Sequence, residues 1–588
     1  MYPSKGRRNP IHDVARERLT EHRLMDAELE VLRAGARRWA TLGAAAKIGL
    51  LLECRDTVYR QAGRWTAAAA AAKGLTGSPL AGEEAIGGPW AILRALNAYT
   101  ATLCDIERRG RVRIDPRSIR RRSNGQIVVD VFPAEAWDRV LLNGIRAEVW
   151  MQPGVTPETL DDTVAPWYRQ TVRKPRVGLV LGAGNIAAIA PLDVLYKLVA
   201  DGTVCILKMS PVNDYLGPIF EDAFAPLVRD GYLRFAYGGA EVGEYLCRHA
   251  AIDEIHVTGS DKTHDAIVFG DGPGAAERRI RNEPLLQKPI SSELGNVSPT
   301  IVVPGPWKDA DVRFQAENIV TQKLHNGGFN CVASQVLIVP ADWDRTAGLV
   351  AAVENFMRSL GDRPAYYPGA AERTELLAAN GRNVRRYGRE GDGFVARTLL
   401  DADPNAGGER TFTFEAFSSV LGVVRLPGDT ETYVRDAVTF ANDRLRGTLG
   451  GNLIVHPATM RVHRDAFDRA VADLRYGCIG VNAWTGVGFL TCQTPWGAYP
   501  GHTISDVGSG IGVVHNSYLF SRSQKTVVYA PFAPFPRSLF GYGATLLPKP
   551  PWFVSNRNQL KIGMALCDFE MSKTPWTAAR IAALAMGG

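Results

Sequence analysis

Cysteine and long apolar runs are both scarce in this sequence. Its 588 residues include eight cysteines and no Cys-x-x-Cys pair. This usage argues against a zinc site and against a disulfide framework, and it fits the reducing cytoplasm. No stretch approaches the roughly 18 apolar residues that a membrane span needs, and the amino terminus lacks the apolar segment of a signal peptide. We therefore expect a soluble, cytoplasmic protein with no metal site and no membrane span.

Outside one segment, the sequence has no excess of positive over negative residues. The net charge is +7, and residues 108–122 hold eight arginines and one aspartate, so the remaining chain is balanced. Such a patch is typical of a solvated surface hairpin, while contact with a polyanion, an acidic partner or a phosphorylated cofactor is the alternative. Because no nucleic-acid motif and no interleaved aromatic residues accompany the arginines, we expect no nucleic-acid partner.

The first part of the chain predicts helices and then a few strands. The length predicts two to four domains. Helical spacing or composition covers residues 16–39, 42–58, 67–72 and 90–106, with breaks at 74–79 and 87–89. Strand composition covers residues 112–114, 126–132 and 147–152.

Strands alternate with helices from Pro175 onward, which predicts an α/β protein with a doubly wound parallel sheet. Ligands of such sheets bind at the carboxyl ends of the strands. Polar residues recur at the predicted strand ends, at Asn185, Lys208, Ser210 and 258–260. Residues 294–500 repeat the alternation and predict a second α/β unit.

Two short stretches carry the candidate chemistry. Asn326, Gly327 and Gly328 predict a tight loop shortly before Cys331, because asparagine and glycine tolerate positive φ angles. A cysteine at the mouth of such a loop is a candidate nucleophile, whereas the alternative is an inert packed cysteine. Glu293 lies on a predicted strand upstream, where a carboxylate can serve as a general base.

The segments EIHVTGS, SELGNVSP and NGGFNC, in this order, resemble the aldehyde dehydrogenase superfamily. The resemblance implies two doubly wound α/β domains, one cofactor-binding and one catalytic, plus a projecting β segment for oligomerisation into a homodimer or homotetramer. The implied division is an N-terminal helical layer (1–110), a β-hairpin oligomerisation segment (111–170), a Rossmann-like NAD(P)-binding domain (171–293), a catalytic domain (294–515), an oligomerisation strand (516–531) and a C-terminal extension (532–588). The extension is expected to dock on the body or on a neighbouring subunit, with a membrane surface or a lipid substrate as the alternative.

The same resemblance implies roles for individual residues. Cys331 is the implied nucleophile, Glu293 the base that activates water, and Asn185 the donor to the oxyanion. The implied cofactor-binding residues are Lys208, Ser210, Gly259, Ser260, Leu294, Gly295, Glu415 and Phe417. The implied cofactor is NAD or NADP. Pro211 stands where the family commonly has a ribose-binding carboxylate, which favours NADP or dual use.

Three activities are compatible with these motifs. The first is NAD(P)-dependent oxidation of an aldehyde to an acid, which the presence of Glu293 favours. The second is reduction of a fatty acyl-CoA, and the third is a catalytically degenerate scaffold. Asn296, where the family has a second glycine, is expected to crowd the nicotinamide, and Ser418-Ser419 replaces a Gly-Pro pair. Four aromatic residues near the motifs suggest an apolar substrate, with packing in the hydrophobic core as the equal alternative: Phe329, Trp484, Phe489 and Trp496.

Overall fold

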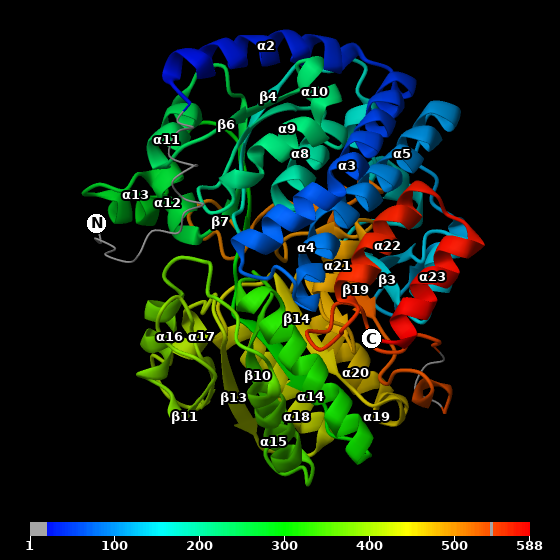
Figure 1. Ribbon diagram of the computed structural model, residues 1–588, viewed down its shortest axis with the longest axis vertical. Coiled ribbons are helices and arrows are strands. Elements are labelled where there is room, and N and C mark those ends of the chain that lie inside the picture. Colours follow the sequence, from blue (N-terminus) through cyan, green and yellow to red (C-terminus); the bar gives the residue numbers. More distant parts are fainter. Residues whose placement is uncertain (1–19, 541–544) are drawn as a thin grey trace.

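Two β-sheets organise the chain, one in each half of the molecule (Figure 1). The computed structural model describes residues 20–540 and 545–588. The predicted α/β class is confirmed, and helices cover both sheets.

The smaller sheet has six strands in the order β17-β8-β7-β4-β5-β6. Its strands are β4 (Val177–Leu181), β5 (Val204–Lys208), β6 (Leu233–Ala236), β7 (Glu254–Gly259), β8 (Ile290–Leu294) and β17 (Gly510–Ile511). Its helices are α8 (Ile189–Val199), α9 (Gly217–Ala223), α10 (Ala225–Arg229), α11 (Ala240–Arg248), α12 (Asp261–Phe269) and α13 (Ala275–Arg281). Strands β4 to β8 are parallel, as predicted, and β17 is antiparallel to β8. Residues 510–511 therefore pair with the cofactor-side sheet, although they fall within the segment expected to form the catalytic domain.

The larger sheet has eleven strands in the order β1-β2-β3-β19-β15-β14-β9-β10-β13-β12-β11. Its central strands are β9 (Ser298–Val302), β10 (Ser334–Pro340), β12 (Arg397–Asp401), β13 (Val420–Leu426), β14 (Gly450–Ile454), β15 (Cys478–Val481) and β19 (Ser523–Tyr529), all paired in parallel. Strand β11 (Arg382–Tyr387) closes one edge in antiparallel pairing. The helices of this half are α14 (Asp309–Leu324), α15 (Thr346–Ser359), α16 (Ala370–Ala378), α17 (Arg410–Thr413), α18 (Thr430–Arg444), α19 (Pro457–Val462), α20 (Arg464–Asp473) and α21 (Gly486–Thr491).

The segment expected to project extends the edge of the larger sheet of the same chain. Its strands are β1 (Ile119–Arg121), β2 (Ile127–Phe132) and β3 (Arg146–Met151). Strand β3 pairs with β19, which pairs with β15 on its other side, so these strands continue the sheet of their own chain. A role of this segment in oligomerisation stays a prediction. The predicted strand at 112–114 is also wrong, since β1 begins at Ile119.

Ion pairs with neighbouring carboxylates engage several arginines of the basic segment. Arg111 pairs with Asp161 at 2.7 Å, and Arg120 pairs with Asp130 at 2.8 Å. The guanidinium of Arg122 lies 3.8 Å from the ring centroid of Trp150. These contacts support the interpretation of residues 108–122 as a solvated surface segment.

Helices of the N-terminal layer pack on the smaller sheet and reach the larger one. They are α2 (His22–Thr41), α3 (Ala44–Ala72), α4 (Gly82–Ala85) and α5 (Ala91–Arg109). The predicted helices at 42–58 and 67–72 are parts of the single helix α3, and residues 16–19 of another predicted helix lie outside the described residues. The break expected at 87–89 falls at Gly88, which has non-helical angles of φ −128° and ψ −114°.

The C-terminal extension folds back onto this layer. Helix α22 (Gln559–Met571) packs against α4, α3 and α5, and α23 (Pro575–Met586) follows it (Figure 1). The contact is close because a Cβ at Gly82 would lie 2.3 Å from the backbone carbon of Gln559. Docking of the extension onto the body of the same chain is thus what the structure shows. None of the described helices is long and apolar enough to cross a membrane.

Replacing Gly82 tests this contact. We expect Gly82→Ala to lower the free energy of unfolding by about 1–3 kcal/mol, because the added methyl group meets backbone atoms that cannot rotate away. Gly63→Ala is the matched control: Gly63 lies inside α3, and a Cβ there meets nothing within 4 Å. The free energy of unfolding of the control should equal that of the wild type or exceed it by up to about 1 kcal/mol, since alanine favours helices. Equal urea midpoints for the two variants would contradict the prediction.

Candidate active site

A cavity of about 990 Å³ lies at the carboxyl ends of β4, β5, β7 and β8 and extends to the half that contains the larger sheet. Ten of the eleven predicted site residues line it: Asn185, Lys208, Ser210, Gly259, Ser260, Glu293, Gly295, Cys331, Glu415 and Phe417. Leu294 is the exception, because its side chain is buried in the core and its backbone N–H donates to the Ser509 carbonyl at 2.8 Å. The fold therefore brings together residues that are far apart in the sequence.

Glu293 lies on β8, which pairs with β17, the strand at one edge of the smaller sheet. Gly510 of β17 is the Cα partner of Glu293 and has a φ of +124°. A Cβ at Gly510 would lie 2.1 Å from the Ser292 carbonyl oxygen, so the pairing requires glycine. Burial raises the pKa of Glu293 to about 7, and the Asp193 carboxylate adds to this, while the Cys331 thiol and the Trp496 indole oppose it. A carboxyl group with this pKa can both accept and return a proton near neutral pH.

Cys331 faces the same cavity and is partly exposed. Burial and then the Glu293 carboxylate raise the pKa of its thiol well above the usual value. The thiol is therefore protonated at neutral pH unless a base removes its proton. Glu293 is the carboxyl group beside it, and neither of its oxygens makes a hydrogen bond of standard geometry with a described residue.

The loop before Cys331 has the geometry that its sequence predicts. Asn326, Gly327 and Gly328 have φ angles of +54°, +69° and +84°. A Cβ at Gly328 would lie 2.4 Å from the Ser418 carbonyl oxygen, so this glycine allows the loop to pack against the segment that carries Glu415 and Phe417. We call residues 325–331 the nucleophile loop.

Lys208 and Ser260 lie on the cofactor side of the cavity, at the ends of β5 and β7. Burial lowers the pKa of Lys208 to about 8, against the opposing effect of Asp214. Ser260 caps α12, and its hydroxyl accepts the Thr263 backbone N–H at 3.2 Å. The amino end of α12 thus faces the cavity, an arrangement that suits a phosphate group.

Glu415 and Phe417 lie in a loop that an arginine holds in place. Arg373, which the sequence reasoning missed, donates to the Ala416 carbonyl at 2.9 Å and to the Phe417 carbonyl at 3.0 Å. Burial raises the pKa of Glu415 to about 8, although Arg373 and Lys323 oppose this shift. A Cβ at Gly295 would lie 2.1 Å from the Glu415 carboxylate, so the glycine after Leu294 leaves room for it.

Asn296 and the four aromatic residues do not enter the cavity lining. The Asn296 amide donates to the Gly450 carbonyl at 3.1 Å, and its oxygen accepts the Ser298 hydroxyl at 3.1 Å. The expected crowding by Asn296 is therefore wrong. Trp484 and Trp496 are buried in the hydrophobic core, so neither supports an apolar substrate.

Comparisons with known proteins agree with this geometry. The profile of the Aldehyde dehydrogenase family matches residues 168–370. The chain is 28% identical over 332 residues to a 1-pyrroline-5-carboxylate dehydrogenase of Geobacillus thermodenitrificans, a match that covers 52% of this chain and 59% of that protein. It is 30% identical over 165 residues to a 3-sulfolactaldehyde dehydrogenase of Priestia aryabhattai, covering 28% of this chain and 27% of that one. The chain thus matches less than two thirds of either relative.

Solved structures share the fold at lower identity. An NADP-dependent glyceraldehyde-3-phosphate dehydrogenase from Bacillus halodurans superposes with a TM-score of 0.58 at 17% identity, covering 87% of this chain and 92% of that one. An NAD-dependent aldehyde dehydrogenase from Sinorhizobium meliloti superposes with a TM-score of 0.57 at 16% identity, covering 87% of each. Over residues 168–370 the chain is thus similar in sequence to the Aldehyde dehydrogenase family, and the whole chain shares the fold of a solved aldehyde dehydrogenase.

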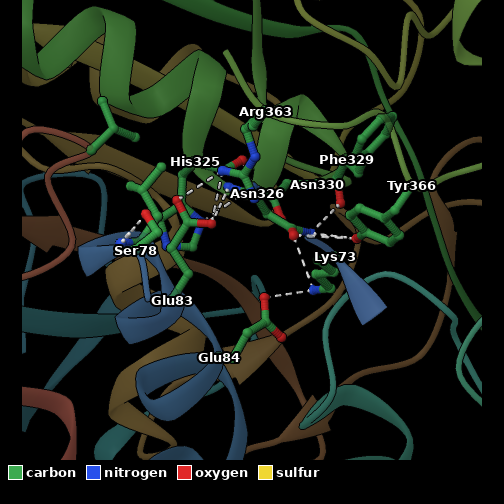
Figure 2. A network of polar contacts seen from close by, with 12 residues as sticks. Lys73, Ser78, Glu83, Glu84, His325, Asn326, Phe329, Asn330, Arg363 and Tyr366 are labelled. Carbon is green, nitrogen blue, oxygen red and sulfur yellow. Dashed lines mark hydrogen bonds and ion pairs between the residues drawn. The ribbon is translucent and has the colours of Figure 1, made fainter. Parts of the chain in front are cut away.

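A buried lysine joins the N-terminal layer to the nucleophile loop (Figure 2). The ammonium group of Lys73 donates to the Glu84 carboxylate at 2.7 Å, the Asn185 carbonyl at 2.9 Å and the Asn326 side-chain oxygen at 3.0 Å. Tyr366 also donates to the Asn185 carbonyl, at 2.9 Å. No sequence motif marked Lys73, because its partners come from three separate parts of the chain.

A second ion pair fixes the start of the loop. The Glu83 carboxylate accepts the Asn326 backbone N–H at 3.1 Å and pairs with Arg363 at 3.0 Å. The Asn185 side-chain amide donates to the Phe329 carbonyl at 2.9 Å, which leaves its other amide hydrogen for a ligand. Helix α4 thus sets the backbone that precedes Cys331.

Replacing Lys73 tests this network. We expect Lys73→Met to lower the free energy of unfolding by about 3–5 kcal/mol, because the buried Glu84 carboxylate loses its countercharge. The double variant Lys73→Met/Glu84→Gln should lose less, since it leaves no unpaired charge. Urea denaturation measures both variants. If Lys73→Met unfolded at the wild-type midpoint, the network would not stabilise the fold.

The pH dependence of thiol labelling tests the Cys331–Glu293 contact. Without cofactor, the labelling of Cys331 by iodoacetamide should rise continuously from pH 7 to pH 9, because the thiol pKa is well above its usual value. Glu293→Gln removes a negative charge that raises this pKa, so labelling at pH 8 should be about tenfold faster. Mass spectrometry of the peptide that contains Cys331 gives the rate, and Cys331→Ser reports labelling elsewhere. Equal labelling in Glu293→Gln would show that the carboxylate does not act on the thiol, and slower labelling would show that it assists deprotonation more than it raises the thiol pKa.

Proposed function

We propose that the protein oxidises an aldehyde to a carboxylic acid with NAD or NADP. One observation carries the proposal: a buried carboxyl group, Glu293, and a nucleophilic thiol, Cys331, share one cavity at the strand ends. The similarity of residues 168–370 to the Aldehyde dehydrogenase family supports it. The activity is a proposal for the whole protein, because the chain matches only part of its named relatives.

The residues present fit the proposed cofactor. Lys208 and Ser210 lie at the end of β5, and the amino end of α12 can accept a pyrophosphate. One oxygen of the buried Glu415 carboxylate, Oε1, has no hydrogen-bond partner among the described residues, which fits a ribose hydroxyl as its missing donor. The cofactor, when bound, supplies the hydride acceptor.

The preference between NAD and NADP rests on charge. Pro211 lines the cavity without a carboxylate, so nothing at this position repels a 2′-phosphate. Arg248 and Lys262 also line the cavity, while Glu244 is a nearby opposing charge. We propose NADP or dual use on this basis.

In the proposed reaction, Glu293 accepts the Cys331 proton and the thiolate attacks the aldehyde carbon. The Cys331 backbone N–H and the free Asn185 amide hydrogen would bind the oxyanion, and such donors are each worth about 3 kcal/mol in comparable sites. Loss of hydride from the thiohemiacetal leaves a thioester on Cys331. Glu293, having released its proton, then takes a proton from water as the water attacks the thioester, and the acid leaves as the thiol forms again.

Pre-steady-state kinetics test the proposal. Wild-type protein, given NAD or NADP and a panel of aldehydes, should reduce the cofactor with a burst followed by turnover. Cys331→Ala should abolish the burst, whereas Asn185→Ala should slow it by about 100-fold or more. Glu293→Gln should turn over at least about 100-fold more slowly, because hydrolysis of the thioester loses its base.

Two outcomes would redirect the assignment. Turnover that requires coenzyme A or an acyl-CoA would favour an acyl-CoA reductase. Absence of any cofactor reduction, with correctly folded protein, would favour the catalytically degenerate scaffold. The preferred cofactor is the one that gives the larger kcat/KM with the same aldehyde.

A further inference from the structure

A second cavity, of about 310 Å³, lies beside the nucleophile loop and shares no lining residue with the cavity at Cys331. Gly327 and Phe329 of the nucleophile loop and Ser418-Ser419 form part of its wall. Residues 361–365 and residues 554–557, which precede α22, form other parts. None of the predicted site residues lines this second cavity, so the proposed reaction leaves it without a role.

Positive charge dominates the wall of the second cavity. Its charged residues are Arg363, Arg389, Arg397, Arg557 and Asp362. Arg397 pairs with Asp362 at 3.2 Å, while Arg557 makes no ion pair within the described part of the chain. Arg363 pairs with Glu83 at 3.0 Å and Arg389 pairs with Asp392 at 3.3 Å, and neither of these carboxylates lines the cavity.

Several of these arginine N–H groups are buried without an acceptor. The Nε of Arg397 and the Nε and Nη2 of Arg363 make no hydrogen bond to any described residue. Arg397 as a whole is 8% exposed. A buried donor without an acceptor costs free energy. These three nitrogens are closed to solvent, so an anion in the second cavity would meet the exposed guanidinium groups of Arg389 and Arg557.

The remaining wall is apolar. Leu324, Phe329 and Val554 are buried there, and Leu360 and Phe394 are partly buried. The Arg389 guanidinium lies 4.3 Å from the ring centroid of Phe394, which joins the charged and apolar parts of the wall. An inorganic ion would leave this apolar surface uncovered, and a neutral ligand would leave the arginine donors unpaired.

We propose that the second cavity binds a small organic carboxylate that carries a short apolar chain. Guanidinium groups bind carboxylates through paired N–H donors, and the volume is at the lower end of the range for small-molecule sites, about 300–1,000 Å³. The apolar chain packs against Leu324, Phe329 and Val554, and the carboxylate faces the arginines. The bound ligand contacts the nucleophile loop on the side away from Cys331.

Calorimetric titration of the full-length protein with octanoate tests this proposal. Octanoate should bind saturably, at one ligand per chain, in the second cavity. Octanol has the chain without the charge and acetate has the charge without the chain, so each should bind at least about tenfold more weakly. Equal binding of octanol or of acetate would overturn the proposal.

Variants locate the ligand. Arg389→Ala/Arg557→Ala removes two exposed arginines that line only the second cavity, and it should weaken octanoate binding by about tenfold or more. Arg464→Ala, an exposed arginine on α20 that lines neither of these two cavities, is the matched control and should bind octanoate as the wild type does. Undiminished binding to the double variant would overturn the proposal. Calorimetry does not measure cofactor reduction. A failure of the octanoate proposal can therefore be told apart from a failure of the proposed dehydrogenase activity.

Discussion

The position of Cys331 depends on one buried ammonium group. Lys73, at the end of α3, is 3% exposed and donates to acceptors from α4, from the loop after β4 and from the nucleophile loop. Each acceptor would be costly to bury alone, and the lysine would be more so. The four groups are therefore stable only together, and their mutual arrangement fixes the backbone before Cys331 (Figure 2).

Burial also raises the pKa of two carboxyl groups on the other side of the nucleophile loop. Glu293 and Glu415 have pKa values of about 7 and 8, because burial penalises their charged forms more than nearby groups compensate. Neither carboxylate is neutralised by a close ion pair within the described residues, unlike Glu83 and Glu84. The protein thus holds two kinds of buried carboxylate near one loop: paired ones that position the backbone and unpaired ones that face the cavity.

Segments remote in the chain support this arrangement. Strand β17 borders the strand that carries Glu293, and α22 of the C-terminal extension packs on α4, which carries Glu83 and Glu84. The extension is therefore connected through one short helix to the nucleophile loop. The second cavity lies in the same region, since its wall includes both the nucleophile loop and residues 554–557.

The sequence by itself determined the local features. Strand–helix alternation predicted the α/β class, the loop of Asn326 and two glycines was predicted from backbone freedom alone, and the order of three motifs identified Cys331 and Glu293. These features depend on residues adjacent in the chain. Only the tertiary structure decided that β1 to β3 extend the larger sheet, that Asn296 turns away from the cavity, and that Lys73 and Arg373 hold the two loops of the site. Those outcomes depend on contacts between distant segments, and the choice of partner for a strand edge or a buried charge leaves no periodic pattern in the sequence.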